Sequence, residues 1–469
     1  MKEIVESYFA HRSMVNHQLA SYDDCIPIGD GKGSRMESIV RGIRIGSDED
    51  LEDVPGGKEA GGMIKLDVLD KEIFIRMKGI RLGAPTVREA NGAEHPATPL
   101  ECRLRKLTYF SPIYMDFKIY RDDLPPSSTD SDIGFIEEEG VHIGNLPIMV
   151  RSGRCNLHPD HIAGTQEKSL KLSPTTSAED ALRHKELLRK SGEDPLDPGG
   201  YFIINGTERV LISMEDLAPN RVTVEKNKKY AHETEVAKIF SQKDGVRKPI
   251  NVEKRRDGML MVKIPSAGTT AIPVVLLMRA LGMENDRDIF SAIAGPVEAM
   301  KYTVANLNDV KDNPEYGVDN TEEAMAWLEK KFAAGQQKEY RESRIQNLLD
   351  KELLPHLGSD ESVRTKKAIF LGRIVRQVLE MAITNRDPND KDHYANKRVR
   401  LAGDLMEDLF RVGVQGLARD LKYQLERHHN RKRELKINSC LRPDVLTSKI
   451  MHALATGNWV GGRSGVSQL

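Results

Sequence analysis

Cys155, His158 and His161 are the residues of this sequence whose spacing could bind a metal ion. They form a Cys-x-x-His-x-x-His pattern, and all three side chains can coordinate zinc. A structural zinc site needs four ligands, and no second close pair of Cys or His follows at a comparable spacing. Pro159 excludes the two histidines from a regular helix interior. A zinc-dependent protein is therefore a rival hypothesis, and we expect a polar loop here.

Three Asp-x-Asp pairs could hold Mg²⁺ for phosphoryl or nucleotidyl transfer, because carboxylate oxygens are ligands that this ion prefers. The pairs are Asp130/Asp132, Asp286/Asp288 and Asp390/Asp392. None of them lies in a glycine-tight, apolar setting. We expect acidic surface loops at these positions, and neither a catalytic residue nor a metal ligand in this chain.

The glycine-rich segment 29–34, Gly-Asp-Gly-Lys-Gly-Ser, has only part of the pattern of a phosphate-binding loop. That loop requires Ser or Thr directly after its Lys, where the hydroxyl reaches the metal ion, and Gly33 stands there instead. No apolar strand precedes the segment. We expect a flexible connection without a nucleotide-binding function.

The C-terminal tail, residues 457–469, combines glycines with side chains that can bind a nucleic-acid backbone. Glycines allow the chain to approach a phosphate closely, and Arg463 can bind a phosphate through two hydrogen bonds. Ser464 and Gln468 can donate further hydrogen bonds. Trp459 has two open interpretations: a wedge against nucleic acid, or a residue packed in the core.

Charge is unevenly distributed along the chain of 469 residues. The whole chain has a net charge of −1, but residues 361–469 have a net charge of +9 and residues 1–360 a net charge of −10. The most basic stretch is His-His-Asn-Arg-Lys-Arg at residues 428–433, which we interpret as a turn. A basic C-terminal quarter indicates a polyanion contact. The alternative interpretation of this charge is that the Lys and Arg residues lie on solvent-exposed helices and bind no polyanion.

Composition favours a soluble globular protein of several domains, with 39% apolar and 30% charged residues. The N-terminus lacks the apolar core of a signal peptide, and the longest apolar run, residues 271–278, is too short to span a bilayer. The four cysteines are far apart, which indicates reduced thiols. We expect a cytoplasmic protein that does not contact a membrane.

A mixture of strands and helices must position the candidate residues. Residues 199–212 predict a β-hairpin, because two apolar runs flank Asn205-Gly206, a dipeptide suited to a two-residue turn with positive φ. Residues 221–335 read as a separate, mixed insertion domain. These patterns, together with a helical last quarter, predict an α+β fold.

Two helices are expected in the last quarter. The apolar residues from Leu371 to Ala382 repeat with a 3.6-residue period, which predicts the first helix. The second helix is expected from about Asp404 to Arg427, interrupted at Gly413 and Gly416.

Four parts of the sequence resemble the second-largest subunit of multisubunit RNA polymerases. Residues 143–152 and the hairpin 199–212 look like the signature of that family's protrusion domain. Residues 392–403 are similar to its return segment, and residues 453–468 resemble its fork region. These segments occur in the family's order and span nearly the whole chain. The resemblance is closest to the N-terminal half of the archaeal form, in which two genes encode the subunit.

The resemblance implies a multi-domain mixed α/β subunit with a discontinuous protrusion, an inserted lobe and a helical fork region. The implied boundaries are 1–220 for the first part of the protrusion, 221–335 for the lobe, 336–412 for the return segment and 413–469 for the start of the fork. Because the family continues beyond the equivalent of Leu469, we expect the rest of the fork in further reading frame or in an adjacent gene.

The resemblance also implies that this chain contributes no catalytic residue, since the largest subunit binds the catalytic Mg²⁺ of the family. Protrusion and lobe would form one wall of the DNA cleft, and fork loops would help to separate the strands and hold the DNA–RNA hybrid. Expected partners are the largest subunit, the C-terminal half of the split subunit, template and non-template DNA, and nascent RNA.

Three groups of residues are implied to bind nucleic acid. They are Trp459, Arg463, Ser464 and Gln468 in the tail, Arg431, Arg433 and Lys436 in the basic turn, and Lys397 and Arg398 in the return segment. The alternative to the polymerase hypothesis is an independent nucleic-acid-binding protein with a basic C-terminal region.

Overall fold

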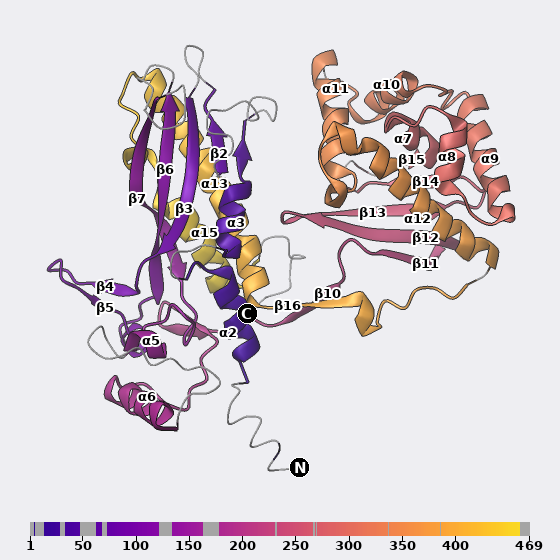
Figure 1. Ribbon diagram of the computed structural model, residues 1–469. Helices are drawn as coiled ribbons and strands as arrows, with labels where there is room; N and C mark the ends of the chain where they lie inside the picture. Colours follow the sequence, from indigo (N-terminus) through magenta and orange to yellow (C-terminus); the bar gives the residue numbers. More distant parts are fainter. Residues whose placement is uncertain are drawn as a thin grey trace. The chain divides into compact units, whose positions relative to one another are not determined.

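The chain forms two compact units, which Figure 1 colours along the sequence. The first unit combines Met1–Met214 with Val399–Leu469, and the second unit is Glu215–Arg398. Each unit has its own hydrophobic core. The computed structural model describes residues 4, 14–28, 33–46, 62–67, 73–121, 134–162, 178–229, 232–265, 268, 270–335, 337–384 and 386–459.

A five-stranded sheet organises the first unit, with the strand order β1-β2-β3-β6-β7. The strands are β1 (Arg44–Ile45), β2 (Gly62–Lys65), β3 (Ile73–Leu82), β6 (Phe110–Arg121) and β7 (Gly134–Pro147). The pairing is parallel between β1 and β2 and antiparallel from β2 to β7. Alternate residues of β3, such as Ile73, Ile75 and Met77, belong to the core because successive side chains of a strand point to opposite faces.

Helices from both ends of the chain pack on this sheet (Figure 1). They are α2 (Asn16–Cys25), α3 (Arg35–Gly42), α13 (Ala402–Asn430), α14 (Ile437–Cys440) and α15 (Pro443–Thr456). α3 contacts β3, α15 contacts β7, and α13 contacts α2 and α15. The N-terminal and C-terminal segments therefore form one core, so the first unit is discontinuous in sequence.

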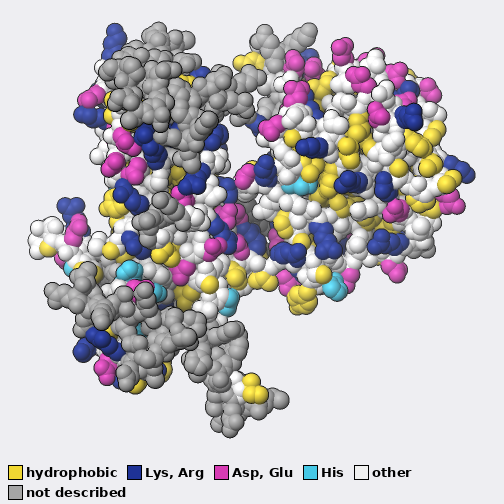
Figure 2. Space-filling view, in the orientation of Figure 1, with side chains coloured by type: hydrophobic (Ala, Val, Ile, Leu, Met, Phe, Trp, Pro, Cys, Tyr) yellow, Lys and Arg dark blue, Asp and Glu magenta, His cyan; other side chains and the backbone are white. Residues whose placement is uncertain are grey.

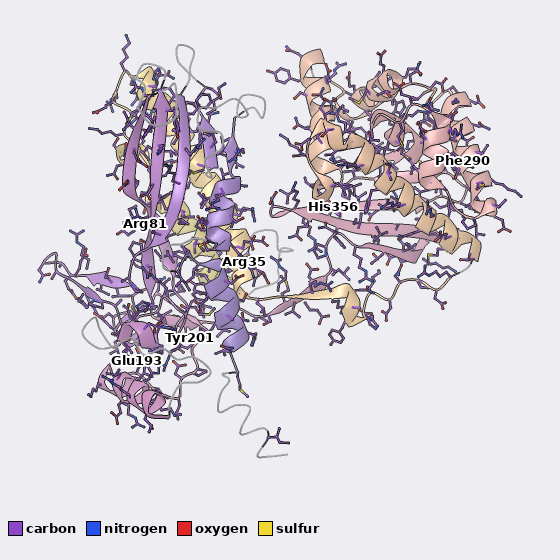
Figure 3. All side chains as sticks on the ribbon, viewed as in Figure 1. Arg35, Arg81, Glu193, Tyr201, Phe290 and His356 are labelled. Carbon is purple, nitrogen blue, oxygen red and sulfur yellow. The ribbon has the colours of Figure 1, made fainter. Side chains whose placement is uncertain are left out.

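Arg35 connects three of these helices (Figure 3). Its guanidinium pairs with Asp24 of α2 at 2.6 Å and with Asp404 of α13 at 2.5 Å. Both carboxylates raise the pKa of Arg35, against the opposing effect of its partial burial. The three-way ion pair fixes the first turn of α13 against the N-terminal helices.

The smaller elements of the first unit include the predicted hairpin, which the structure confirms. β8 (Phe202–Ile204) pairs antiparallel with β9 (Thr207–Arg209), and Asn205 and Gly206 have φ of 51° and 76°. Two central residues with positive φ are what the turn required. The remaining elements are β4 (Thr86–Arg88), β5 (Glu94–Pro96), α4 (Pro99–Leu104), α5 (Pro159–Ile162) and α6 (Ala178–Lys190).

Asp23 on α2 carries a carboxyl group whose protonation affects stability. One of its oxygens accepts a hydrogen bond of 2.9 Å from the Gly153 N–H, while burial raises its pKa from 3.8 to about 6. Because the folded chain holds the proton more tightly than the unfolded chain, this group's contribution to stability is lost as the pH rises from about 4 to about 6.

Asp23→Asn should therefore stabilise the chain at pH 7 by about 1–3 kcal/mol, since the amide oxygen can still accept from Gly153 without a buried charge. At pH 4 the variant and the wild type should have nearly equal free energies of unfolding, measured by urea denaturation at both pH values. A difference that is the same at both pH values would contradict this account.

The second unit is built on an antiparallel sheet with the strand order β11-β12-β13-β14-β15. The strands are β11 (Val222–Lys229), β12 (His232–Lys243), β13 (Val246–Lys254), β14 (Leu260–Lys263) and β15 (Ala271–Pro273). Its helices are α7 (Val274–Ala280), α8 (Asp286–Ile293), α9 (Val297–Asp312), α10 (Thr321–Phe332), α11 (Lys338–Asn347) and α12 (Arg364–Thr384). A π-helical turn, η2 (Leu348–Glu352), follows α11 directly.

The second unit extends beyond the insertion predicted from sequence. It begins at Glu215 instead of Arg221, and it ends at Arg398 instead of residue 335. The reason is α12, whose apolar stripe, including Leu371 and Val375, is buried in the core of the second unit and contacts β11, β12 and β13. The 3.6-residue period predicted this helix correctly, but it did not show which core the helix joins.

α13 is a single helix of 29 residues, Ala402–Asn430. The expected interruptions at Gly413 and Gly416 are absent, and the expected boundary between residues 412 and 413 falls inside the helix. A Cβ on Gly413 would lie 2.6 Å from Leu446 of α15, so this glycine permits close helix packing instead of a break. The residues expected to begin a separate fork region thus pack in the core of the first unit.

The chain enters and leaves the second unit through two paired strands. β10 (Met214–Leu217) and β16 (Lys397–Arg400) form a two-stranded sheet. Insertion of one folded unit into another requires the two connecting segments to run close together, which this pairing provides. Helices and predominantly antiparallel sheets in both units confirm the α+β class.

Candidate nucleic-acid interface

The basic turn, residues 431–436, follows the last residue of α13, and residues 428–430, which were expected in a turn, belong to that helix. The helix ends with two hydrogen bonds: the Lys432 N–H donates to the His429 carbonyl at 2.8 Å, and the Arg433 N–H donates to the His428 carbonyl at 3.0 Å. This pair is the Schellman arrangement, which satisfies carbonyls at the end of a helix. The turn thus has a defined backbone shape.

Three consecutive cations of the basic turn are exposed. Within the described ranges, the side chains of Arg431, Lys432 and Arg433 have no ion pair. Lys436 is also exposed, but it pairs with Glu434 at 3.0 Å. The C-terminal end of a helix carries about half a negative charge, so the three cations exceed it several-fold and leave a positive surface.

Glu138 of β7 holds the segment that follows the basic turn. One carboxylate oxygen accepts from the Ile437 N–H at 2.9 Å, and the other accepts from the Asn438 N–H at 3.0 Å. Leu435 and Ile437 are buried on either side of the exposed Lys436. The turn is therefore anchored at both ends, by the helix cap and by β7.

Trp459 is packed in the core of the first unit. Its side chain is 8% exposed, and its indole N–H donates to the Leu405 carbonyl on the first turns of α13 at 2.7 Å. A buried indole with a satisfied N–H is typical of a residue that stabilises the fold. Of the two interpretations left open by the sequence, this geometry favours core packing.

Trp459 and the basic turn lie at opposite ends of α13. Trp459 bonds to Leu405 near the first residue of the helix, and the basic turn follows its last residue. At a rise of about 1.5 Å per residue, a helix of 29 residues is about 40 Å long. Trp459 and the basic turn therefore do not belong to one compact site.

Lys397 and Arg398 on β16 have partners within the chain. The Lys397 ammonium pairs with Glu215 and, at 3.7 Å, with Asp392, and the hydrogen bond to Glu215 raises the pKa of Lys397. Arg398 donates to the carbonyls of Ala395 and Lys397. Because these groups already have partners, they are weaker candidates for phosphate binding than the basic turn. Arg463, Ser464 and Gln468 lie outside the described residues.

The structure shows a further basic surface, on α12, that the sequence patterns had not led us to expect. Lys366 and Arg373 are exposed and Arg376 is half-buried, all on the side opposite the buried stripe of this helix. Figure 2 shows Lys and Arg side chains over the face of the second unit that carries α12. The same helical period that predicted the apolar stripe could have found this one, because positions 366, 373 and 376 share a face.

Cys155, His158 and His161, the ligands of the rival zinc hypothesis, each have another partner in the structure. Cys155 is fully buried, its thiol accepts a hydrogen bond from the Tyr109 hydroxyl at 3.4 Å, and burial raises its pKa. His158 Nδ1 accepts the backbone N–H of Asp160 at 3.4 Å, and burial lowers the pKa of His158, while His161 is hydrogen-bonded to the Gly153 carbonyl at 3.0 Å. Each group has a structural partner, so these residues give no support to a zinc site.

Among the residues that the structure describes, Glu89, His95 and Glu101 form a cluster with the donors of a metal site. Arg105 donates to both carboxylates at 2.6 Å, so a guanidinium already occupies the place of a cation. These ion pairs lower the pKa values of Glu89 and Glu101 without any metal ion. We assign no metal to this cluster.

The Asp-x-Asp pairs within the described residues also have structural partners. Asp286 binds Arg279 at 2.6 Å and Lys311 at 2.7 Å, and one Asp390 oxygen accepts the N–H of Asp392 at 2.8 Å. Asp130 and Asp132 lie outside the described residues. Asp390 and Asp392 thus lie in the expected loop, whereas Asp286 and Asp288 lie in the first turn of α8, where Asp286 forms ion pairs.

The glycine-rich segment 29–34 leads into a helix. Ser34 is the N-cap of α3, where its hydroxyl accepts the N–H of Glu37 at 3.2 Å. A hydroxyl in this position satisfies one of the unpaired N–H groups at a helix start. Residues 29–32 of the segment lie outside the described ranges.

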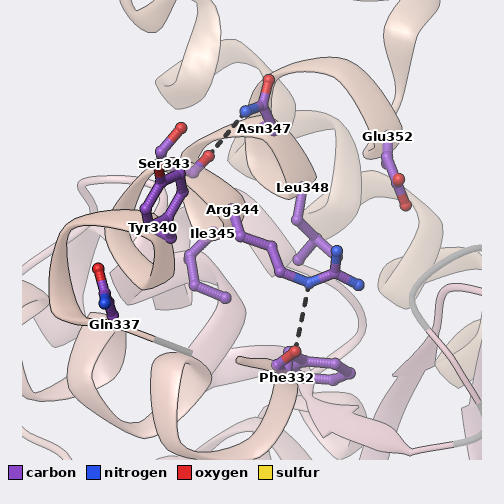
Figure 4. A pocket seen from close by; sticks show the side chains of 9 residues that line it. All are labelled: Phe332, Gln337, Tyr340, Ser343, Arg344, Ile345, Asn347, Leu348 and Glu352. Carbon is purple, nitrogen blue, oxygen red and sulfur yellow. Dashed lines mark hydrogen bonds between the residues drawn. The ribbon is translucent and has the colours of Figure 1, made fainter. Parts of the chain in front are cut away.

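The second unit contains a pocket of about 490 Å³ between the end of α10, α11 and η2 (Figure 4). In it, Arg344 donates to the Phe332 carbonyl at 3.3 Å, and Asn347 donates to the Ser343 carbonyl at 2.8 Å. These bonds connect side chains to nearby backbone and place no nucleophile beside a base.

In the described part of the chain, no helix is long and apolar enough to cross a membrane.

Comparisons with known proteins found one matching family model in each of the two units. Residues 13–171 match the family model described as RNA polymerase beta subunit, and residues 218–400 match the model described as RNA polymerase Rpb2, domain 2. The second match agrees within a few residues with the second unit, Glu215–Arg398. The chain is also 40% identical over 476 residues to DNA-directed RNA polymerase subunit Rpo2N of Halobacterium salinarum, covering 100% of this chain and 80% of that protein.

The chain belongs to this Rpo2N family. A second Rpo2N, from Methanococcus vannielii, is 38% identical, with coverage of 99% of this chain and 82% of the relative. In Saccharolobus solfataricus, the similar protein is the longer subunit Rpo2, of which 36% is covered at 37% identity. These relatives confirm the expected kinship with the N-terminal half of the split archaeal subunit, and with it membership of an RNA-synthesising enzyme complex.

Proposed function

We propose that this Rpo2N-family chain forms one wall of the DNA cleft of its polymerase and binds nucleic-acid phosphates through the basic turn. The first unit would be the protrusion and the second unit the lobe. Expected partners are the C-terminal half of the split subunit and the largest subunit, which would bind the catalytic Mg²⁺. Template and non-template DNA and nascent RNA complete the assembly.

The observation that carries this proposal is the unneutralised charge of Arg431, Lys432 and Arg433. Lys397 and Arg105, by contrast, are held by carboxylates. Exposed cations without carboxylate partners can replace the counterions of a nucleic acid, and release of those counterions drives binding. The glycine-rich tail with Arg463, Ser464 and Gln468 is proposed as a second contact, on the chemistry of its residues alone.

Arg431→Gln combined with Arg433→Gln should weaken the elongation complex of the reconstituted polymerase in a salt-dependent way. Removal of one cation from a phosphate should reduce the slope of log stability against log salt by about 0.7–0.9, so the double variant should reduce the slope by about 1.5. The measurement is the half-life of stalled elongation complexes across a series of KCl concentrations.

A matched control is Arg189→Gln combined with Lys190→Gln, two exposed cations at the end of α6 in the same unit. This pair removes the same charge from a different helix end and should leave the slope unchanged. Equal slopes for both double variants and the wild type would overturn the proposed role of the basic turn.

A further inference from the structure

The pocket of about 490 Å³ beside α11 contains a cation and an anion that form no ion pair within the described part of the chain (Figure 4). Glu352 ends η2, and its carboxylate oxygen Oε2 is buried without a hydrogen-bond donor. Arg344 uses its Nε–H for the Phe332 carbonyl, which leaves the four N–H groups of its two terminal nitrogens for a ligand. In Figure 4 these nitrogens extend toward the side of the pocket on which Glu352 stands.

Glu352 differs in this respect from the other acid of the same turn. Both oxygens of Asp350 accept hydrogen bonds from the Arg364 guanidinium, at 2.8 Å and 2.7 Å. A carboxylate oxygen that is removed from water without a donor loses its hydration without compensation. Glu352 as a whole is half-buried and lines the pocket, so a cationic group in the pocket can reach its carboxylate and offset this loss.

The turn η2 is held in a fixed position by α12. The Leu353 N–H donates to the Leu348 carbonyl five residues earlier at 2.9 Å, which is the hydrogen bond of a π-helical turn. The ammonium of the buried Lys367 donates to the carbonyls of Leu349 at 2.9 Å and Asp350 at 2.6 Å. Turns of this kind are frequent at functional sites, and an anchored turn loses little conformational freedom when a ligand binds.

Apolar side chains form much of the remaining wall of the pocket. Ile345 is fully buried, Leu348 is 6% exposed, and Phe332 adds an aromatic ring. A volume of about 490 Å³ is in the range of sites for small molecules, which commonly combine apolar walls with a few polar groups that orient the ligand. A molecule with an apolar body and one charge of each sign would match all of these groups.

We propose that this pocket binds a zwitterion of the α-amino-acid class with an apolar side chain. The carboxylate of the ligand pairs with the terminal nitrogens of Arg344 through two hydrogen bonds. Its ammonium pairs with Glu352, and its side chain packs against Ile345 and Leu348. A ligand with only one charge would leave Arg344 or Glu352 unpaired. This inference is independent of the nucleic-acid contact, because the pocket lies in the second unit.

Three related probes test whether both charges of the ligand are recognised. L-Leucine carries both, leucinamide lacks the carboxylate, and N-acetylleucine lacks the ammonium. Titration of the full chain, followed by saturation-transfer difference NMR, should show that each singly charged probe binds at least about tenfold more weakly than leucine, as expected for the loss of a charge-assisted pair. Equal affinities of the three probes, or no saturable binding of leucine, would overturn the proposal.

Variants of the two charged residues assign each recognition step. Glu352→Gln should bind leucine and N-acetylleucine with nearly equal affinity, because the ammonium no longer has a partner. Arg344→Gln should lose the preference for leucine over leucinamide. If either residue had only a structural role, its variant would change the thermal midpoint and leave these affinity ratios at the wild-type values, and the assignment would be wrong.

The control variants remove equivalent charges outside the pocket. Glu342→Gln on α11 and Arg287→Gln on α8 change exposed side chains that do not line the pocket, and both should keep all affinity ratios. The rival to a ligand is a direct ion pair between Arg344 and Glu352 in solution. That pair would make the effects of the two single variants on thermal stability non-additive in the double variant, without any binding of leucine.

Discussion

Gly403→Ala should destabilise the first unit by about 3 kcal/mol, among the largest effects expected for adding a single methyl group to this chain. Gly403 lies in the first turn of α13, where the helix crosses α2. A Cβ built on Gly403 overlaps the carbonyl oxygen of Ser21, which is backbone and cannot rotate away. α2 and α13 must therefore separate, which also disturbs the ion pairs of Arg35 with Asp24 and Asp404.

The same helix contains its own control, Gly416. No atom lies within 4 Å of a Cβ built there, so Gly416→Ala adds a methyl group without a clash. Since alanine favours helix over glycine by about 1 kcal/mol, this variant should be slightly more stable than the wild type.

Unfolding of the first unit can be followed by tryptophan fluorescence. The chain has two tryptophans, and Trp327 belongs to the second unit, so a Trp327→Phe background leaves Trp459 as the reporter of the first unit. Urea midpoints of the two glycine variants should shift in opposite directions. Similar midpoints for Gly403→Ala and Gly416→Ala would show that the helices can adjust at no cost.

Trp459→Ala should lower the free energy of unfolding of the first unit by about 3–5 kcal/mol, as expected for removal of a buried aromatic side chain. Trp459→Phe should lower it by about 1–2 kcal/mol, because the ring is mostly retained while the Leu405 carbonyl loses its hydrogen bond. Urea denaturation followed by circular dichroism measures both, and the salt slope of Trp459→Phe should stay at the wild-type value.

Trp327→Phe is the matched control for Trp459→Phe. Trp327 also donates its indole N–H to a carbonyl, that of Glu315 at 3.0 Å, but its side chain is only partly buried. Its loss should therefore cost less than that of Trp459. A Trp459→Phe variant with normal stability and an altered salt slope would instead support the wedge interpretation.

Local sequence patterns were sufficient to predict the features that depend only on residues close together in the chain. Asn205-Gly206 predicted the hairpin turn, and the apolar period from Leu371 to Ala382 predicted α12. The basic turn was also visible, because three cations in a row need no tertiary information. Each of these features is set by backbone preferences or by composition within a few residues.

Patterns of the same kind failed where packing decides. Gly413 and Gly416 suggested breaks in a helix, yet α13 continues through both because its buried face packs against α2 and α15. The end of the insertion was placed too early, since α12 has the same amphipathic pattern whichever core it joins. Helix propensity is a weak signal compared with the burial of an apolar face.

The sequence by itself determined the family, the α+β class, the hairpin and the charge of the basic turn. Only the tertiary structure showed which of the described candidate residues already have partners within the chain. Trp459 is buried in the core, where its indole N–H donates to the Leu405 carbonyl. The Lys397 ammonium forms an ion pair with Glu215, a residue far away in sequence. Such contacts arise from the packing of distant segments, and no local pattern records them, because a side chain has the same identity whether it is paired or exposed.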